Sequence, residues 1–417
     1  MSTLTKVEVE DARDLNARAR GLEESAALDA REAAEARVPV AFVVTQSGAR
    51  ANGGVESITQ VVERLRRVRP VVVTQSESPF NQRWREAGAD VRVWPMPSLS
   101  VASLFKNNLR AFQLVREEGC RVVHCNDIHA LWQTAFGARL AGASVVFNVR
   151  NVKPEGSPYG RRWRLARRIS TRQLVLSKEM AEALARRLGV GGSSAARARL
   201  EHIYSAVDTE KLSPVDGERR AALREKLGIE ADCFAVGVVA AFERRKGQLD
   251  FIRESVPRLL RLAPRARVFF VGDFEPEREA YARRCLEEAK GAGVAQFVSF
   301  VGYTEDVADW YRALDAVAVP SRNEGLARCM IESLACATPV ASFDVCSARE
   351  ILEGKGCGLV VSSGNQEALA EALASLAWDE EARARLGARG AAAARELFDP
   401  LEVVRAYERL YISLAGK

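Results

Sequence analysis

Short apolar runs alternate with helical stretches along most of this chain, and that alternation constrains the fold more than any other feature. The runs are too apolar for half-exposed strands, which predicts strands buried on both faces. Such strands, alternating with helices, form parallel, doubly wound sheets. The predicted strands are 38–44, 71–74, 91–93, 121–124 and 144–148, followed by 234–239, 268–271, 297–301, 316–319 and 340–343.

The predicted strands fall into two series, and the sequence between the series breaks both patterns. Ser, Asp, Thr and Pro interrupt residues 204–215. A chain of 417 residues is also longer than one hydrophobic core normally serves. We therefore predict an α/β protein with two Rossmann-like, doubly wound domains that face each other across a cleft. The predicted boundaries are a charged helical extension at 1–37, an N-terminal domain at 38–205, a C-terminal domain at 206–398 and a final helix at 399–417.

Composition is that of a soluble globular protein, with 47% hydrophobic and 28% charged residues. No apolar run approaches the ~20 residues that cross a bilayer. Residues 1–37 are polar and rich in Ala, Arg and Glu, unlike a secretory signal, so we expect a cytoplasmic protein. The eight cysteines contain no C-x-x-C pair, so we expect neither a disulfide framework nor a zinc site.

Six arginines and no acidic residue lie between Gly160 and Leu174. Apolar residues recur among them every three positions, at Trp163, Ala166 and Ile169. A basic amphipathic segment of this kind suits an anionic membrane surface, a phosphorylated lipid or another acidic acceptor. An equally open alternative is a solvated face whose arginines pair with acidic side chains elsewhere. The predicted acceptor or anionic surface consists of Arg161, Arg162, Arg164, Arg167 and Arg168.

Two glutamates eight positions apart flank a glycine turn directly after the predicted strand 316–319. This turn falls at the carboxyl edge of a sheet, where open α/β folds bind ligands. A helix beginning near Leu326 would offer free N–H groups to a phosphate or diphosphate. Glu324 would accept hydrogen bonds from paired sugar hydroxyls, and Glu332, about two turns into the helix, from a second diol such as a ribose. The predicted ligand is therefore a sugar, a diphosphate and a nucleoside in a row.

The segment from Glu324 to Glu332 resembles the E-x7-E signature of glycosyltransferase family 4, retaining enzymes of the GT-B fold that use nucleotide-sugar donors. Seven further stretches resemble the family in the expected order: 52–56, 122–127, 175–178, 203–208, 246–248, 271–273 and 337–342. The resemblance covers roughly residues 38 to 415. It implies that the N-terminal domain binds the acceptor, that the C-terminal domain binds the donor, and that the final helix returns to the N-terminal domain.

Two glycines and two cations complete the predicted donor site. Gly53 and Gly54 follow the first strand and open a helix, so their backbone can approach a phosphate or the reacting sugar closely. Arg245 and Lys246 follow the first strand of the second series, where their charge would stabilise a leaving diphosphate without a metal or other cofactor. The predicted donor-binding residues are Gly53, Gly54, Arg245, Lys246, Glu324, Gly325, Leu326, Ala327 and Glu332.

The chain departs from the family pattern in two places. Family members usually carry an arginine shortly before the lysine, where this chain has Ala240 and Ala241. They also commonly carry a histidine at the position of Asn126, which contacts the transferred sugar. His129 either compensates for that replacement or only begins the next helix. The predicted catalytic residues are Glu324, Lys246, Asn126 and His129.

The leading interpretation is a retaining glycosyltransferase that moves a sugar from a nucleoside diphosphate donor to a hydroxyl of a glycan, a lipid-linked acceptor or a small molecule. A peripheral contact with the inner face of the membrane follows from the arginine segment. One alternative is an epimerase or phosphorylase of the same architecture. Another is a scaffold that has lost activity, which Ala240, Ala241 and Asn126 suggest. A net charge of +6 without an aromatic stacking platform argues against nucleic acid. The sugar, the base, the acceptor and the oligomeric state stay open.

Overall fold

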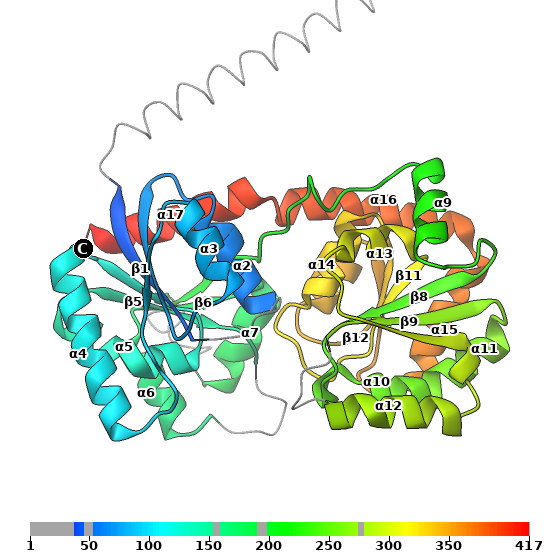
Figure 1. Ribbon diagram of the computed structural model, residues 1–417, viewed down its shortest axis with the longest axis horizontal. Coiled ribbons are helices and arrows are strands. Elements are labelled where there is room, and N and C mark those ends of the chain that lie inside the picture. The colour runs from blue at the N-terminus through cyan, green and yellow to red at the C-terminus, as the bar shows by residue number, and fades with distance from the viewer. Residues whose placement is uncertain (1–36, 46–52, 153–158, 190–197, 274–278, 417) are drawn as a thin grey trace, which may run out of the picture.

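The chain forms two α/β domains that lie side by side, each built on one parallel sheet (Figure 1). The computed structural model describes residues 37–45, 53–152, 159–189, 198–273 and 279–416. The predicted helical extension lies outside these ranges apart from its last residue, Arg37. The predicted fold of two doubly wound domains is confirmed.

The first domain holds a seven-stranded sheet in the order β3-β2-β1-β4-β5-β6-β7. Alternate residues of its central strand face two cores. Val40 and Phe42 pack with one set of helices, and Ala41 and Val43 pack with the other. The strands are β1 Val38–Val44, β2 Val68–Thr74, β3 Asp90–Val93, β4 Val122–Cys125, β5 Ser144–Val149, β6 Arg172–Val175 and β7 Leu200–His202.

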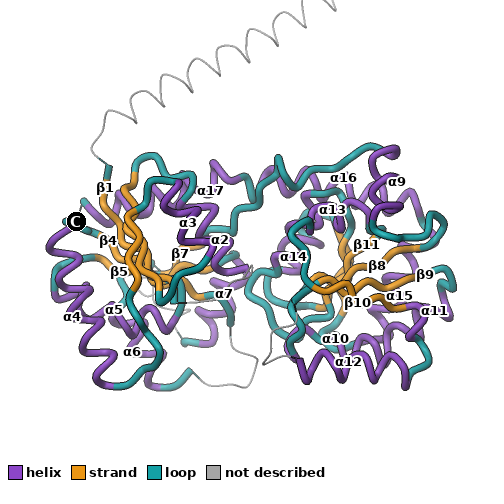
Figure 2. The backbone as a smooth tube through the Cα atoms, viewed as in Figure 1, coloured by secondary structure: helices purple, strands orange, loops and turns teal. Residues whose placement is uncertain are grey.

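Helices cover both faces of this first sheet. Core residues of α4, α5 and α6 join one cluster, and core residues of α2, α3 and α17 join the other. Figure 2 shows the same arrangement of purple helices around orange strands. The bounds are α2 Gly53–Val62, α3 Pro79–Glu86, α4 Val101–Glu118, α5 Ile128–Leu140, α6 Arg161–Ile169 and α7 Lys178–Arg187.

The second domain holds a six-stranded sheet in the order β10-β9-β8-β11-β12-β13. Its strands are β8 Phe234–Val239, β9 Ala266–Val271, β10 Val298–Gly302, β11 Ala316–Val319, β12 Val340–Phe343 and β13 Gly358–Val361. Its helices are α9 Gly217–Lys226, α10 Gln248–Asp250, α11 Val256–Leu262, α12 Glu279–Gly291, α13 Val307–Ala313, α14 Arg328–Ala335, α15 Gln366–Trp378 and α16 Glu380–Leu397. Short helical turns are η1 Arg244–Lys246, η2 Phe251–Ser255, η3 Ala295–Phe297 and η4 Arg349–Glu353.

The last helix, α17 Pro400–Ala415, crosses back from the second domain onto the first (Figure 1). The Tyr411 hydroxyl lies 3.0 Å from Nδ1 of His124, and both side chains are buried. The Glu408 carboxylate accepts hydrogen bonds from the backbone N–H groups of residues 66 and 67, both at 2.7 Å. The chain therefore connects its two domains at two points. One is the segment that enters the second domain, and the other is the return to the first domain through α17.

Two local predictions need correction. The helix after the glycine turn begins at Arg328, because the preceding residue, Ala327, is extended with ψ of 110°. Glu332 therefore lies one turn into the helix. The basic segment spans a helix and a strand, because α6 ends at Ile169 and Arg172 opens strand β6. All eight cysteines are free. Within the described ranges, no helix combines the length and the apolar character needed to cross a membrane.

Candidate active site

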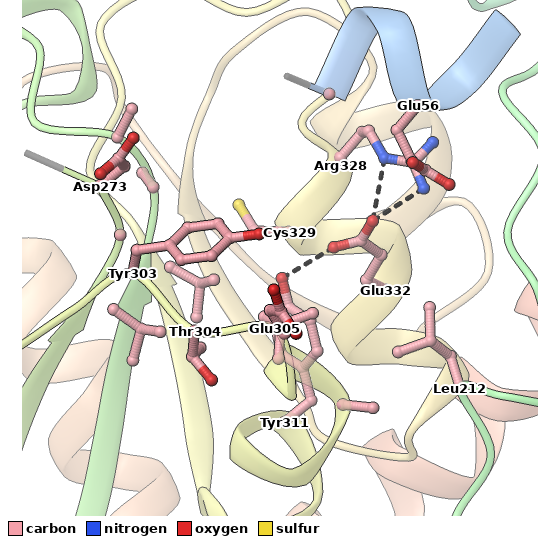
Figure 3. A pocket seen from close by; sticks show the side chains of 18 of the residues that line it. Glu56, Leu212, Asp273, Tyr303, Thr304, Glu305, Tyr311, Arg328, Cys329 and Glu332 are labelled. Carbon is pink, nitrogen blue, oxygen red and sulfur yellow. Dashed lines mark hydrogen bonds and ion pairs between the residues drawn. The ribbon is translucent and has the colours of Figure 1, made fainter. Parts of the chain in front are cut away.

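A pocket of about 780 Å³ opens between the two domains. Helix α2 lines the pocket from the first domain, and the carboxyl ends of β8, β9 and β10 line it from the second. Figure 3 shows the wall formed by α14, with Tyr303 and Asp273 on the opposite side. Both domains are therefore needed to form the cavity. Its walls include Gly53, Glu56, Gln60, Arg245, Lys246 and Glu332.

Glu332 faces this pocket and is held there by two partners. Arg328, one turn earlier on α14, donates from Nε to the carboxylate at 2.9 Å, and the Tyr311 hydroxyl donates to its other oxygen at 3.0 Å (Figure 3). Burial, and then the charge of Glu332, raise the pKa of Tyr311 well above its ordinary value, so the tyrosine remains a donor. The carboxylate is thus fixed in place with lone pairs left for a ligand.

Glu324 lies behind two cations instead of on the pocket wall. Its carboxylate is 2.6 Å from Nζ of Lys246 and 3.2 Å from Nη1 of Arg245, and both cations line the pocket. Burial would raise the pKa of the Glu324 carboxyl, but the neighbouring charges of Lys246 and Arg245 outweigh it and hold the pKa below its ordinary value. The carboxylate therefore stays charged and orients both cations. Its predicted contact with sugar hydroxyls stays a prediction.

The short turn η1 brings these cations to the glutamate. Gly247 follows it with φ of 75°, a conformation that side chains disfavour. A Cβ at Gly247 would also lie 2.0 Å from the carbonyl oxygen of Pro320, at the end of β11. The backbone N–H of Arg322 donates to the Arg245 carbonyl at 2.7 Å, which fixes the two loops together. Close packing at this glycine therefore places Lys246 next to Glu324.

The two glycines that open α2 lie against the second domain and against a buried arginine. A Cβ at Gly53 would lie 2.9 Å from Cδ of Arg328, and one at Gly54 would lie 1.8 Å from Nη1 of Arg150. Gly53 lines the pocket, whereas Gly54 is buried and its carbonyl accepts a hydrogen bond from Asn126 at 3.4 Å. Asn52, which begins this motif, lies outside the described residues.

The glycine turn before α14 meets the first domain directly. A Cβ at Gly325 would lie 1.9 Å from the carbonyl oxygen of Arg150. Leu326 and Ala327 point their side chains into the core. No hydrogen bond joins the N–H groups of these three buried residues to another described residue, which leaves donors for an anion, but none of the three residues lines the pocket.

The structure does not bring every predicted catalytic residue to the pocket. Asn126 is fully buried beside the glycine turn, where it contacts the Gly54 carbonyl and accepts a hydrogen bond from Asn148 at 3.4 Å. His129 is the second residue of helix α5, and its Nε2 lies 3.1 Å from the carbonyl oxygen of Met96. This contact supports a structural role for His129. Among the described residues, nothing connects its side chain to the pocket.

Sequence reasoning missed two arginines at the domain contact. Arg328 was discoverable, because an arginine four residues before Glu332 on one helix is placed to pair with it. Arg150 directly follows β5, at the same sheet edge as Gly54, but nothing in its local sequence marks it. Burial lowers the pKa of Arg150 to about 10 despite the attraction of Asp127. At the positions where family members usually carry an arginine, Ala240 and Ala241 line the pocket.

The predicted basic surface lies away from the pocket, on helix α6. Arg161, Arg162, Arg164 and Arg168 are exposed, and none forms an ion pair with another described residue. Arg167 is half-buried, and its carbonyl accepts a hydrogen bond from the Ser170 hydroxyl at 3.4 Å. The sequence left open whether these arginines pair with acidic side chains elsewhere. Among the described residues, none of the four exposed arginines forms such a pair.

Each domain matches the model of a glycosyltransferase family. Residues 51–211 match Glycosyltransferase Family 4, and residues 219–393 match Glycosyl transferases group 1. The chain is 28% identical over 214 residues to a lipopolysaccharide core biosynthesis mannosyltransferase of Rhizobium meliloti, covering 51% of this chain and 60% of that protein. It is 32% identical over 204 residues to a D-inositol 3-phosphate glycosyltransferase of Xylanimonas cellulosilytica, covering 47% of each. The matches span about half the length of these curated relatives.

Solved structures of the same fold extend across nearly the whole chain. HepE of Anabaena, in complex with UDP, superposes with a TM-score of 0.76 at 20% identity and covers 91% of this chain and all of that one. A glycosyltransferase of Rickettsia africae superposes with a TM-score of 0.78 at 15% identity and covers 91% of this chain and 99% of that one. Both likenesses establish the two-domain GT-B fold.

Proposed function

We propose that this chain, whose two domains are both glycosyltransferase domains, moves a glycosyl group from a nucleoside diphosphate sugar to an acceptor hydroxyl and retains the anomeric configuration. The observation that carries the proposal is the pocket between the domains, where the cations Arg245 and Lys246 and the carboxylate of Glu332 face one space. Cations suit a diphosphate and a fixed carboxylate suits a diol. HepE, which shares the fold, was solved with UDP and with UDP-glucose, and this supports a nucleotide-sugar donor.

In the proposed complex the diphosphate contacts Lys246, Arg245 and the free N–H groups at 325–327. Glu332 accepts hydrogen bonds from the ribose hydroxyls, and the base extends towards the carboxyl ends of β8 to β10, near Tyr303. Because Glu324 already orients Lys246, the ammonium group needs little reorganisation when the phosphate arrives.

Bond cleavage places negative charge on the departing diphosphate, and stabilising that charge is the main task for the side chains. Lys246 and Arg245 supply positive charge at this point, so we propose no metal ion or other cofactor. The acceptor hydroxyl attacks from the face that the leaving group vacates and gives its proton to the departing phosphate oxygen. The scheme needs no nucleophile from the protein, and Asn126, which is buried, would affect the transferred sugar only through the Gly54 carbonyl that it contacts.

The acceptor enters from the first domain in this proposal. Two similar proteins are named a lipopolysaccharide core biosynthesis mannosyltransferase and a D-inositol 3-phosphate glycosyltransferase, and the phosphate in the second name is anionic. The exposed arginines of α6 fit an acceptor of that charge or the membrane that holds it. We therefore propose a cytoplasmic enzyme with a peripheral contact at the inner face of the membrane.

Thermal unfolding with UDP-, GDP-, ADP- and dTDP-sugars tests the donor assignment, because a ligand at a hundred times its Kd adds about 2.7 kcal/mol to the free energy of unfolding. One of the four should raise the unfolding temperature, and transfer or hydrolysis of that donor should follow. Stabilisation by none of them, with no turnover, would favour the inactive scaffold instead.

Glu332→Gln then tests the ribose contact. A hydrogen bond to a charged group contributes about 1.5–3 kcal/mol, so the Kd for the donor should rise about 10- to 100-fold. The matched control is Glu287→Gln, which changes an exposed glutamate of α12 and should leave the Kd unaltered. A donor Kd unchanged in Glu332→Gln would remove this carboxylate from the site.

A further inference from the structure

Exposed apolar side chains concentrate on one side of the first domain. Val101 and Phe105 of α4 are 84% and 72% exposed, and Leu140 of α5 is 80% exposed. Leu109 on α4 and Phe136 on α5 are about half exposed. A folded protein scatters single apolar residues over its surface, but five on two neighbouring helices form a patch that needs an explanation.

These five residues belong together because the two helices cross in close contact. A Cβ at Gly137 of α5 would lie 1.7 Å from the carbonyl oxygen of Asn108 on α4, and the Gly137 N–H donates to the Asn108 side chain at 2.9 Å. Phe105 and Leu109 flank Asn108 on α4, and Phe136 precedes Gly137 on α5. The apolar side chains of both helices therefore meet around the crossing point.

Within α4, residues 101, 105 and 109 are four apart and share one stripe, as do residues 136 and 140 within α5. We define the apolar patch by its members, which are Val101, Phe105, Leu109, Phe136 and Leu140.

Unpaired cations border this patch on the next helix. Helices α4, α5 and α6 lie side by side over one face of the first sheet (Figure 1), and α5 packs against both others. The exposed arginines of α6 have no ion-pair partner among the described residues, and Leu165 between them is 43% exposed. Lys106 adds an exposed cation beside Phe105. The outer surface of this helix layer is therefore apolar on one side and basic on the other.

We infer that this surface docks on an anionic lipid bilayer, with the apolar patch in the interfacial region and the α6 arginines on the acidic head groups. Charge complementarity selects the bilayer as occupant. Bare cations beside apolar side chains match a surface that offers acidic head groups over hydrocarbon within a few ångströms. Exposed lysine and arginine on the rim of apolar residues is the same combination that holds amphipathic helices in an interface.

Docking in this orientation brings one end of the patch to the edge of the sheet at which the pocket opens. In a parallel sheet with crossover helices, the N-terminal ends of the helices lie at the carboxyl edge of the strands, where the pocket opens. Val101 is the first residue of α4, and Ile128, which is also exposed, is the first residue of α5. The patch thus begins at the edge that carries Asn126 and the glycine turn. This step rests on the proposed function, since it delivers a lipid-borne acceptor to the transferase cleft.

Vesicle sedimentation tests the docking surface without any turnover, so its failure is distinguishable from failure of the transferase proposal. The full chain should sediment with vesicles of phosphatidylcholine and phosphatidylglycerol and stay in solution with phosphatidylcholine alone. Phe105→Glu combined with Leu140→Glu should weaken binding at least about tenfold, because both side chains leave the interface. Arg162→Gln combined with Arg168→Gln should weaken it about 25-fold, at about fivefold for each lost cation.

The matched control is Leu401→Glu, which alters a half-exposed leucine of α17, on the opposite face of the same sheet, and should leave vesicle binding unchanged. Thermal unfolding of each variant checks that it folds. Three results would overturn the inference: no sedimentation of the wild type, equal binding to neutral and acidic vesicles, or a dimer in light scattering that Phe105→Glu converts to monomer.

Discussion

Replacing Gly325 with alanine tests whether the contact between the two domains is the one in which the enzyme works. A Cβ at this position would lie 1.9 Å from the carbonyl oxygen of Arg150, whereas real Cβ atoms essentially never come within 3.0 Å of another heavy atom. The obstacle is the backbone of the other domain, so no change of rotamer relieves it. The loop and Arg150 must separate by about 1.1 Å, the difference between 3.0 and 1.9 Å.

Such a separation would move the catalytic groups of one domain away from those of the other. Misplacement by about 1 Å costs about 100-fold in rate, so kcat of Gly325→Ala should fall about 100-fold. Affinity for the donor should change far less, because most of the predicted donor contacts come from the second domain alone. Neither domain core is touched, so the unfolding temperature should stay close to that of the wild type. Steady-state kinetics, calorimetric donor binding and thermal unfolding separate these three quantities.

Gly217→Ala is the matched control, because a Cβ at Gly217 meets open space at the start of α9 in the same domain. It should leave all three quantities unchanged. If Gly325→Ala retained the kcat of the wild type, the contact with Arg150 would not belong to the working conformation. If kcat and the unfolding temperature fell together, damage to the loop would explain the result instead.

Two further predictions follow from charged contacts. Glu324→Gln should lower the free energy of unfolding at neutral pH by about 3 kcal/mol, because it leaves the half-buried Lys246 without its closest partner. Folding depresses the pKa of Glu324, so its contribution is present above the ordinary value of 4.5 and is lost as the pH falls through the folded value. Denaturant unfolding should therefore show the two proteins converging in acid, and a constant gap would contradict the assignment. Glu350→Gln should loosen the domain contact, because the Glu350 carboxylate accepts hydrogen bonds from the Tyr204 hydroxyl and the backbone N–H of Glu179. Hydrogen exchange at that N–H should accelerate by about tenfold or more, and unaltered exchange would mean that the contact does not hold the domains.

The sequence predicted the strands with clear apolar runs well and missed the short strands β6, β7 and β13. Strand β8 carries six residues of which five are fully buried, so its apolar run predicts its bounds correctly. Strand β7, Leu200–His202, contains one apolar residue and is only half-buried, so no pattern marks it. Strand β6 begins with Arg172 inside the basic segment, and this polar start hides the three buried residues that follow. Pairing with neighbouring strands determines such short strands more than a side-chain pattern of their own.

The candidate site divides in the same way between local and long-range information. The positions of Lys246 and Glu324 after two strands of one sheet follow from the sequence, because parallel strands end at a common edge. Their direct pairing does not follow, because it depends on the approach of Gly247 to the Pro320 carbonyl. Arg150 was missed for the same reason, since only the folded structure brings it to Gly325.

If the donor is a nucleoside diphosphate sugar, as proposed, the surroundings of Arg150 link its binding to the domain contact. Burial lowers the pKa of this guanidinium, Asp127 opposes that effect, and repulsion from Arg328 and Arg245 across the domain contact adds to it. Bringing the domains together therefore places cations from both sides near one another in a poorly solvated space, which costs free energy. A diphosphate bound at Arg245 would replace that repulsion with attraction, so donor binding should favour the closed arrangement by its differential affinity for it. If closure depends on the charge of the donor, the acceptor would bind in the closed cleft only after the donor has bound.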